Sequence, residues 1–132
     1  MTLTAEACRR IAEDHVVWLT TVADSGAPAP NPVWCASDGE DVVVFTTPGS
    51  VRVRNIRQRP LVALNFNSDA RGGELVIITG TATVGPGKPS ALETYRVKYA
   101  AAIRDLHQMT LGQFDAMFDT EIRVRPHKVR PA

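Results

Sequence analysis

The fold is decided by the stretch 42–60, Val42-Val43-Val44-Phe45-Thr46-Thr47-Pro48-Gly49-Ser50-Val51-Arg52-Val53-Arg54-Asn55-Ile56-Arg57-Gln58-Arg59-Pro60. Residues 42–46 predict a strand, because β-branched and aromatic side chains fit the half-buried surface of a sheet. The Pro-Gly-Ser sequence that follows predicts a turn. The next residues predict a short helix that ends before Pro60, since proline disfavours a helical residue ahead of it. The stretch is therefore a strand, a tight turn and a helix in direct succession.

Positive charge is concentrated in the helical part of this stretch. Four arginines fall between Arg52 and Arg59, although the formal net charge of the whole chain is only +1. A guanidinium group presents a planar fork of donors that fits phosphate oxygens. The first N–H groups of a helix add further donors and a favourable dipole. The sequence therefore predicts a site for a localised anion, with phosphate the best fit.

The segments on either side of this stretch predict a mainly β fold. Five further strands are expected at residues 16–22, 30–36, 61–67, 74–84 and 121–126. Pro30 and Pro32 cannot donate to a ladder, so their strand belongs at an edge. Gly80 predicts a bulge or a close backbone approach. Helices are expected at 4–14, 90–106 and 111–118, with Thr4 and Ser90 as N-caps. Short strands and tight turns predict a six-stranded antiparallel barrel with peripheral helices.

Length and composition narrow the class of protein. A chain of 132 residues predicts one domain over residues 1–132, and 44% hydrophobic with 22% charged residues is typical of soluble proteins. The apolar runs are too short to span a membrane, and the N-terminus does not resemble a secretory signal. Cys8 and Cys35 are far apart, which favours reduced thiols and a cytoplasmic location. The balanced charge argues against nucleic-acid binding.

The usual catalytic motifs are missing from the sequence. The three histidines are scattered without ligand spacing, so no metal site is expected. There is also no nucleophile elbow, no Walker motif and no GxGxxG. The catalytic residues stay unassigned at this point.

Several motifs, taken in order along the chain, resemble one family. They are Trp18-Leu19-Thr20-Thr21, the prolines and Trp34 within residues 26–34, Arg-x-Arg-Asn-Ile-Arg-x-x-Pro at 52–60, and Ile122-Arg123-Val124-Arg125-Pro126-x-Lys128-Val129. Together they resemble the pyridoxamine 5′-phosphate oxidase-like split β-barrel flavoproteins, and within them the actinobacterial deazaflavin-dependent reductases. The resemblance implies a six-stranded antiparallel split β-barrel of the FMN-binding type. It also implies a homodimer with cofactor sites at the subunit interface.

The resemblance assigns roles to particular residues. In such families a basic residue after the third strand holds the cofactor phosphate, together with a basic residue and an Asn that follow; here these are Arg52, Arg54 and Asn55. Arginine at position 52 keeps the charge of the lysine found in many relatives but changes the geometry. The full set of implied cofactor-binding residues is Pro32, Val33, Trp34, Gly49, Ser50, Arg52, Arg54 and Asn55. The first three would lie along the tricyclic ring, with contact from the backbone of Pro32 and Val33, whereas the Trp34 side chain is better explained as a core or interface aromatic.

The function implied by the resemblance is an F420-dependent oxidoreductase. It would transfer hydride between reduced coenzyme F420 and a conjugated small-molecule acceptor, with solvent, Lys98 or Tyr99 as the candidate source of the proton. Arg57, Arg59 and Lys128 would line a groove for the oligoglutamate tail of F420, or they are ordinary surface residues. FMN in the same pocket is the close alternative. A non-catalytic flavin or haem carrier is an alternative of a different class, since fold alone does not fix function.

Overall fold

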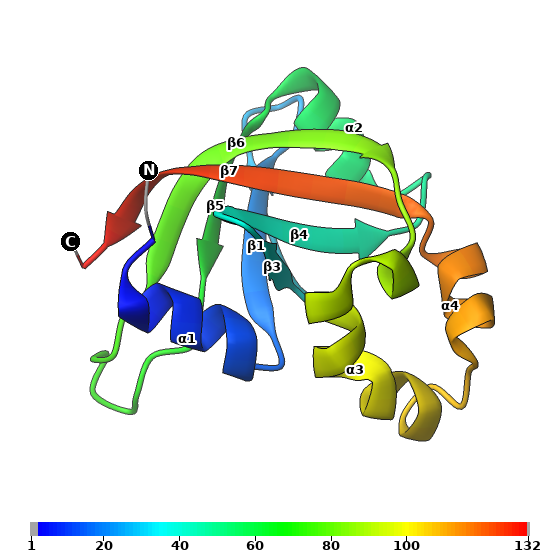
Figure 1. Ribbon diagram of the computed structural model, residues 1–132. Helices are drawn as coiled ribbons and strands as arrows, with labels where there is room; N and C mark the ends of the chain where they lie inside the picture. Colours follow the sequence, from blue (N-terminus) through cyan, green and yellow to red (C-terminus); the bar gives the residue numbers. More distant parts are fainter. Residues whose placement is uncertain (1–2, 132) are drawn as a thin grey trace.

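The computed structural model describes residues 3–131, and these residues build one antiparallel sheet with helices around it (Figure 1). The strands are β1 (Val17–Val22), β2 (Pro28–Val33), β3 (Ala36–Asp38), β4 (Asp41–Thr46), β5 (Leu61–Asn65), β6 (Ile77–Pro86) and β7 (Thr120–Arg130). This confirms the mainly β class. The expected six strands become seven in the described part of the chain, because the strand expected at 30–36 ends at Val33 as β2 and a further short strand, β3, begins at Ala36 and runs beyond that segment.

The sheet curls into a split barrel. Its strand order is β2-β1-β5-β6-β7-β4-β3, so β2 and β3 form the two opposite edges. Only Trp34 and Cys35 separate these two strands along the chain. Three Cα–Cα steps join Val33 to Ala36 and span at most about 11 Å, so the end of β2 lies near the start of β3 although the two strands do not pair. The proline-rich β2 is an edge strand, as its sequence predicts.

The helices are α1 (Ala5–Glu13), α2 (Val51–Gln58), α3 (Glu93–Asp105) and α4 (Leu111–Met117), with a 3₁₀ turn at Pro89–Ala91. Thr4 caps α1 as predicted, because its Oγ1 accepts a hydrogen bond from the Ala7 N–H at 3.1 Å. The predicted cap at Ser90 is wrong, since α3 begins after Leu92. The backbone N–H and hydroxyl of Ser90 both donate to the Asp115 carboxylate instead, which joins the 3₁₀ turn to α4.

The barrel interior holds the main hydrophobic core. Inward side chains such as Leu19, Leu64 and Ile122 are fully buried there, and α1 and α2 add Ile11 and Ile56 to the same cluster. Figure 1 shows α1 at the lower end of the barrel and α2 at the upper end. Each helix therefore closes one mouth of the barrel. The apolar side of α2 packs against the core and thereby fixes the position of that helix.

A second, aromatic cluster lies outside the barrel. Here α3 and α4 pack on β3 and β4, and the cluster includes Phe45, Tyr95, Tyr99 and Phe114. Trp34 stacks on the Tyr99 ring with centroids 4.4 Å apart and planes inclined by 3°. The connection between the two sheet edges is thus held against α3 by aromatic contact.

A bulge confirms the expectation for Gly80. The register between β6 and β7 shifts between Thr79 and Gly80, where Thr79 pairs with Lys128 but Gly80 pairs with Pro126. A Cβ added to Gly80 would lie 2.3 Å from the carbonyl oxygen of Arg125. Only glycine fits at this crossing of two backbones.

Tyr99→Phe should destabilise the protein. The Tyr99 hydroxyl accepts from the buried Cys35 N–H at 2.9 Å and donates to the His15 carbonyl at 2.7 Å, so its loss leaves a buried donor without a partner. We expect a fall of about 1–3 kcal/mol in the free energy of unfolding, measured by urea denaturation. Tyr95→Phe on the same helix is the matched control, because the Tyr95 hydroxyl forms no hydrogen bond within residues 3–131. Equal losses in the two variants would contradict the prediction.

Candidate anion and cofactor site

The turn before α2 leaves backbone N–H groups at the start of that helix available to an anion. Ser50 is the N-cap, and its Oγ accepts from the Val53 N–H at 3.3 Å. The Arg54 N–H reaches the Ser50 carbonyl, so Val51 and Arg52 are left with N–H groups that no helical carbonyl can accept. Gly49 is exposed, and a Cβ placed on it would meet nothing within 4 Å. The backbone at the turn is therefore open to a ligand.

Arg52 is the cation that faces this turn. Its Nη2 donates to Thr46 Oγ1 at 3.2 Å, which ties the guanidinium to the last residue of β4. Its Nε is buried and has no hydrogen-bond partner. Burial lowers the pKa of Arg52 from its usual range, and Arg52 forms no ion pair with an acidic side chain of residues 3–131. A half-buried guanidinium without a counter-ion is costly on its own and becomes favourable when an anion binds.

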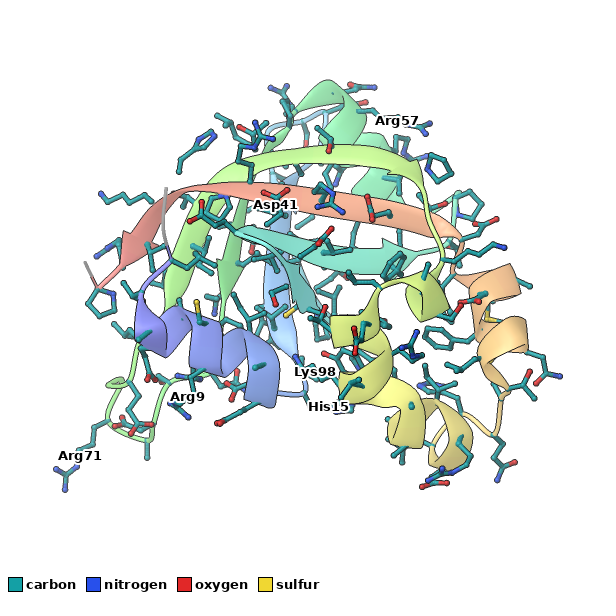
Figure 2. The ribbon with its side chains drawn as sticks, in the orientation of Figure 1. Arg9, His15, Asp41, Arg57, Arg71 and Lys98 are labelled. Atoms are coloured by element: carbon teal, nitrogen blue, oxygen red, sulfur yellow. The ribbon has the colours of Figure 1, made fainter. Side chains whose placement is uncertain are left out.

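The other arginines of α2 do not join Arg52. Residues two positions apart on a helix point to different sides, and Arg54 is exposed on its own side of α2. Arg57 also points outward into solvent (Figure 2). Arg59, just past the helix, donates from Nη2 to the Asp24 carbonyl at 3.0 Å, which links it to the turn between β1 and β2. Of the four, only Arg52 combines burial with a polar neighbour at the turn.

Asn55 points into the barrel mouth. Its side chain is 5% exposed, and its Nδ2 donates to the Thr21 Oγ1 at 3.0 Å, deep in the mouth. Thr21 is itself fully buried on β1. One of the two N–H donors of the Asn55 amide is thus bonded to a strand of the barrel.

The expected ring-binding residues lie at the other end of the β1–β2 hairpin. Pro32 pairs with Trp18 and Val33 pairs with Val17, whereas Thr21 pairs with Ala29. Pro32 is exposed and Val33 is buried. The structure therefore offers the exposed edge of β2, rather than a set of side chains, as a surface for a flat ring.

Trp34 is surrounded by other rings. Besides the stacked Tyr99, the rings of His15 and His107 meet it edge-on at centroid distances of 4.9 and 5.3 Å. Phe114 of α4 is 6.0 Å away. These contacts favour the packing interpretation of Trp34 over direct contact with a cofactor ring.

Lys98 and Tyr99, the candidate proton donors, are engaged in holding α3. The Lys98 ammonium donates to the carbonyls of Ile11 at 2.6 Å and Cys35 at 2.8 Å, and burial lowers its pKa. Burial also raises the pKa of Tyr99. Figure 2 shows Lys98 and His15 together in the space between α1 and α3. Both side chains act here as ties between elements.

Two shallow hollows lie side by side on the outer face of the sheet. The first, about 310 Å³, includes Arg123 and Arg125 of β7, and the second, about 400 Å³, includes Leu61 and Ala63 of β5. His127 borders both and shares a hydrogen bond with Thr81 across the strands at 3.0 Å. Arg123 is already matched by Asp38, Asp41 and Glu121. Leu61 is 65% exposed, so this face combines apolar and basic surface.

Two site residues were not anticipated from the sequence. Thr46 and Thr21 are the side-chain partners of Arg52 and Asn55. The sequence gives one hint. Each threonine lies two positions after an apolar residue of its strand, so its hydroxyl points to the same inward face of the sheet. A buried hydroxyl needs a partner, but the partner's identity depends on where α2 docks.

Other site types find no support in the described part of the chain. Within residues 3–131, no three or more His, Cys, Asp or Glu side chains gather as a possible metal site. None of the helices described is long and apolar enough to cross a membrane.

Residues 3–130 match the family model described as pyridoxamine 5′-phosphate oxidase. A search of curated proteins found no match. Among solved structures, an F420 reductase is 22% identical with a TM-score of 0.70, and the alignment covers 98% of both chains. A conserved hypothetical protein from Mycobacterium tuberculosis is 18% identical with a TM-score of 0.75, over 98% of this chain and 83% of the other.

A haem-storage protein has the same fold. HutZ from Vibrio cholerae is 16% identical with a TM-score of 0.64, over 97% of this chain and 92% of the other. At such identities the likeness to solved structures shows the fold alone. An F420 reductase and a haem-storage protein share it, so the choice between them rests on the residues of the site.

Proposed function

The chain belongs to the pyridoxamine 5′-phosphate oxidase family, and from this membership we propose that it is an F420-dependent oxidoreductase. The reaction is hydride transfer between the reduced deazaflavin and a conjugated small-molecule acceptor. The cofactor supplies the hydride chemistry, and the protein supplies binding and orientation. The observation that carries the proposal is Arg52, whose buried Nε lacks a partner beside the open N-terminus of α2.

The protein's part is to bind and orient the cofactor. Arg52 and the first N–H groups of α2 hold the phosphate, with Ser50 and Gly49 shaping the turn. The exposed edge of β2 at Pro32 and Val33 supports the ring. Val33 lies four positions after Ala29 along β2, which is about 13 Å at 3.3 Å per residue. This separation suits an elongated ligand with its phosphate near one end of the hairpin and its ring near the other.

Charge favours the deazaflavin over FMN. F420 contains a phosphodiester with a single negative charge, whereas a phosphomonoester carries about −1.5 to −2 at pH 7. One half-buried guanidinium matches the diester. The oligoglutamate tail of F420 also needs basic surface beyond the clamp. Arg54 and Arg57 provide it, because α2 has no acidic residue and neither side chain forms an ion pair within residues 3–131.

We further propose that two copies of the chain assemble with the outer face of the sheet at their interface. The exposed Leu61 and the two hollows that meet at His127 lie on this face. Exposed apolar side chains beside basic ones are typical of surfaces that another protein covers. The oligomeric state, measured by light scattering on the purified protein, tests this part directly.

A titration separates the candidate cofactors. Purified protein is titrated with F420 and with FMN, and binding is followed by cofactor fluorescence. We expect tighter binding of F420, with a dependence on salt that reflects the anionic tail. Tight FMN binding without F420 binding would overturn the choice of cofactor.

Turnover separates an enzyme from a carrier. Reduced F420 is mixed with the protein and a panel of quinones, enones and tetrapyrroles, and its oxidation is followed by absorbance. We expect oxidation with at least one conjugated acceptor. Cofactor binding without oxidation across the panel would favour the non-catalytic carrier.

A further inference from the structure

One buried hydrogen bond joins the two halves of the proposed site. Asn55 Nδ2 of α2 donates to Thr21 Oγ1 of β1 at 3.0 Å, and the two residues are 5% and 0% exposed. A polar pair buried this deeply persists only when both partners are satisfied, so it fixes one arrangement of the two elements.

Each partner is connected to a different part of the site. Asn55 lies three residues after Arg52, so the two side chains share one side of α2 and turn together. Thr21 pairs with Ala29 of β2 and thereby belongs to the hairpin that carries the exposed edge at Pro32 and Val33. The hydrogen bond therefore links the helix of the phosphate clamp to the strand pair of the ring surface.

The remaining contacts of α2 constrain its rotation about the helix axis less than the Asn55–Thr21 hydrogen bond does. Val53 and Ile56 are buried in the core, but apolar contact is non-directional. The bond from Arg59 to the Asp24 carbonyl is exposed to solvent. The Asn55–Thr21 bond is directional and dry, and a helix rotated away from it would carry the Arg52 guanidinium off Thr46.

We propose that Asn55 and Thr21 are positioning residues that set the orientation and distance of the phosphate clamp relative to the ring surface on β2. This inference rests on the proposed function, because it assigns a role in binding the same cofactor. It departs from the family expectation that Asn55 itself contacts the phosphate.

The test isolates the contribution of the phosphate. Dissociation constants are measured for FMN and for riboflavin, which differ only in that group, and for F420 against its phosphate-free deazaflavin core. The FMN–riboflavin ratio reports the clamp alone, whereas the F420 ratio reports the clamp and the anionic tail together. Thr21→Val removes the hydroxyl at nearly constant volume, and Thr21→Ser retains it. We expect Thr21→Val to reduce the wild-type ratio by about fivefold or more, and Thr21→Ser to preserve it.

The controls separate positioning from general destabilisation. Tyr99→Phe removes buried hydrogen bonds elsewhere and should leave the ratio unchanged. An unchanged ratio in Thr21→Val, or an equal fall in Tyr99→Phe, overturns the inference while the clamp stands. A wild-type ratio near one for both pairs refutes the clamp itself, and the inference with it. If Thr21→Val does not fold, the same ratio is measured for Thr21→Ala, which leaves room for water beside Asn55.

Discussion

Replacing Arg52 with methionine should weaken cofactor binding without weakening the fold. The loss of a charge-assisted bond to a buried anion costs about 1–3 kcal/mol, or about 5–150-fold in the dissociation constant of F420. The free protein should be as stable as the wild type or more so, because the Arg52 Nε is buried without a partner and burial lowers the Arg52 pKa. The two effects have opposite signs because the Nε and the charge of this guanidinium lack a partner in the free protein and gain one in the complex.

Fluorescence titration and thermal unfolding measure these two effects. Arg57→Met on the same helix is the matched control, since Arg57 is exposed and has no partner within residues 3–131. It should affect only the salt-dependent part of F420 binding and leave riboflavin binding unchanged. A fall in melting temperature for Arg52→Met with unchanged affinity would show that Arg52 is a structural residue.

Gly80→Ala should be among the most damaging single substitutions in this chain. The added Cβ would stand 2.3 Å from the Arg125 carbonyl oxygen, and the nearest atoms all belong to backbone. The two longest strands must therefore separate at the bulge, because no flexible side chain can move aside. We expect a loss of about 2–4 kcal/mol in the free energy of unfolding, measured by urea denaturation.

The same strand provides the control for this substitution. Gly85 also lies in β6, and a Cβ at that position meets nothing within 4 Å. Gly85→Ala should change the free energy of unfolding by less than about 0.5 kcal/mol. Similar losses for the two variants would mean that glycine is needed in β6 for some reason other than the close approach to β7.

Local features of the fold were predictable from the sequence. The strand at 42–46, the turn at Pro48-Gly49-Ser50 and the helix ending before Pro60 depend on neighbouring residues, and the structure confirms each of them. The edge position of the proline-rich strand and the bulge at Gly80 follow from a missing donor and a missing Cβ. Both features are properties of single residues. The end of β2 at Val33 and the start of β3 at Ala36 were not predictable, because each strand is bounded by the partner it pairs with, β1 for β2 and β4 for β3.

The sequence by itself determined that positive charge is concentrated after the third long strand and that the chain forms a mainly β barrel. Both follow from the order of charged, apolar and polar residues along the chain. Only the tertiary structure decided which of these side chains face one another. It brought Arg52 to Thr46, turned Asn55 inward to Thr21 and enclosed Trp34 among the rings of α3 and α4. The phase of a short helix and the burial of a strand end depend on the surface they dock against, and that surface is assembled from residues distant in the chain.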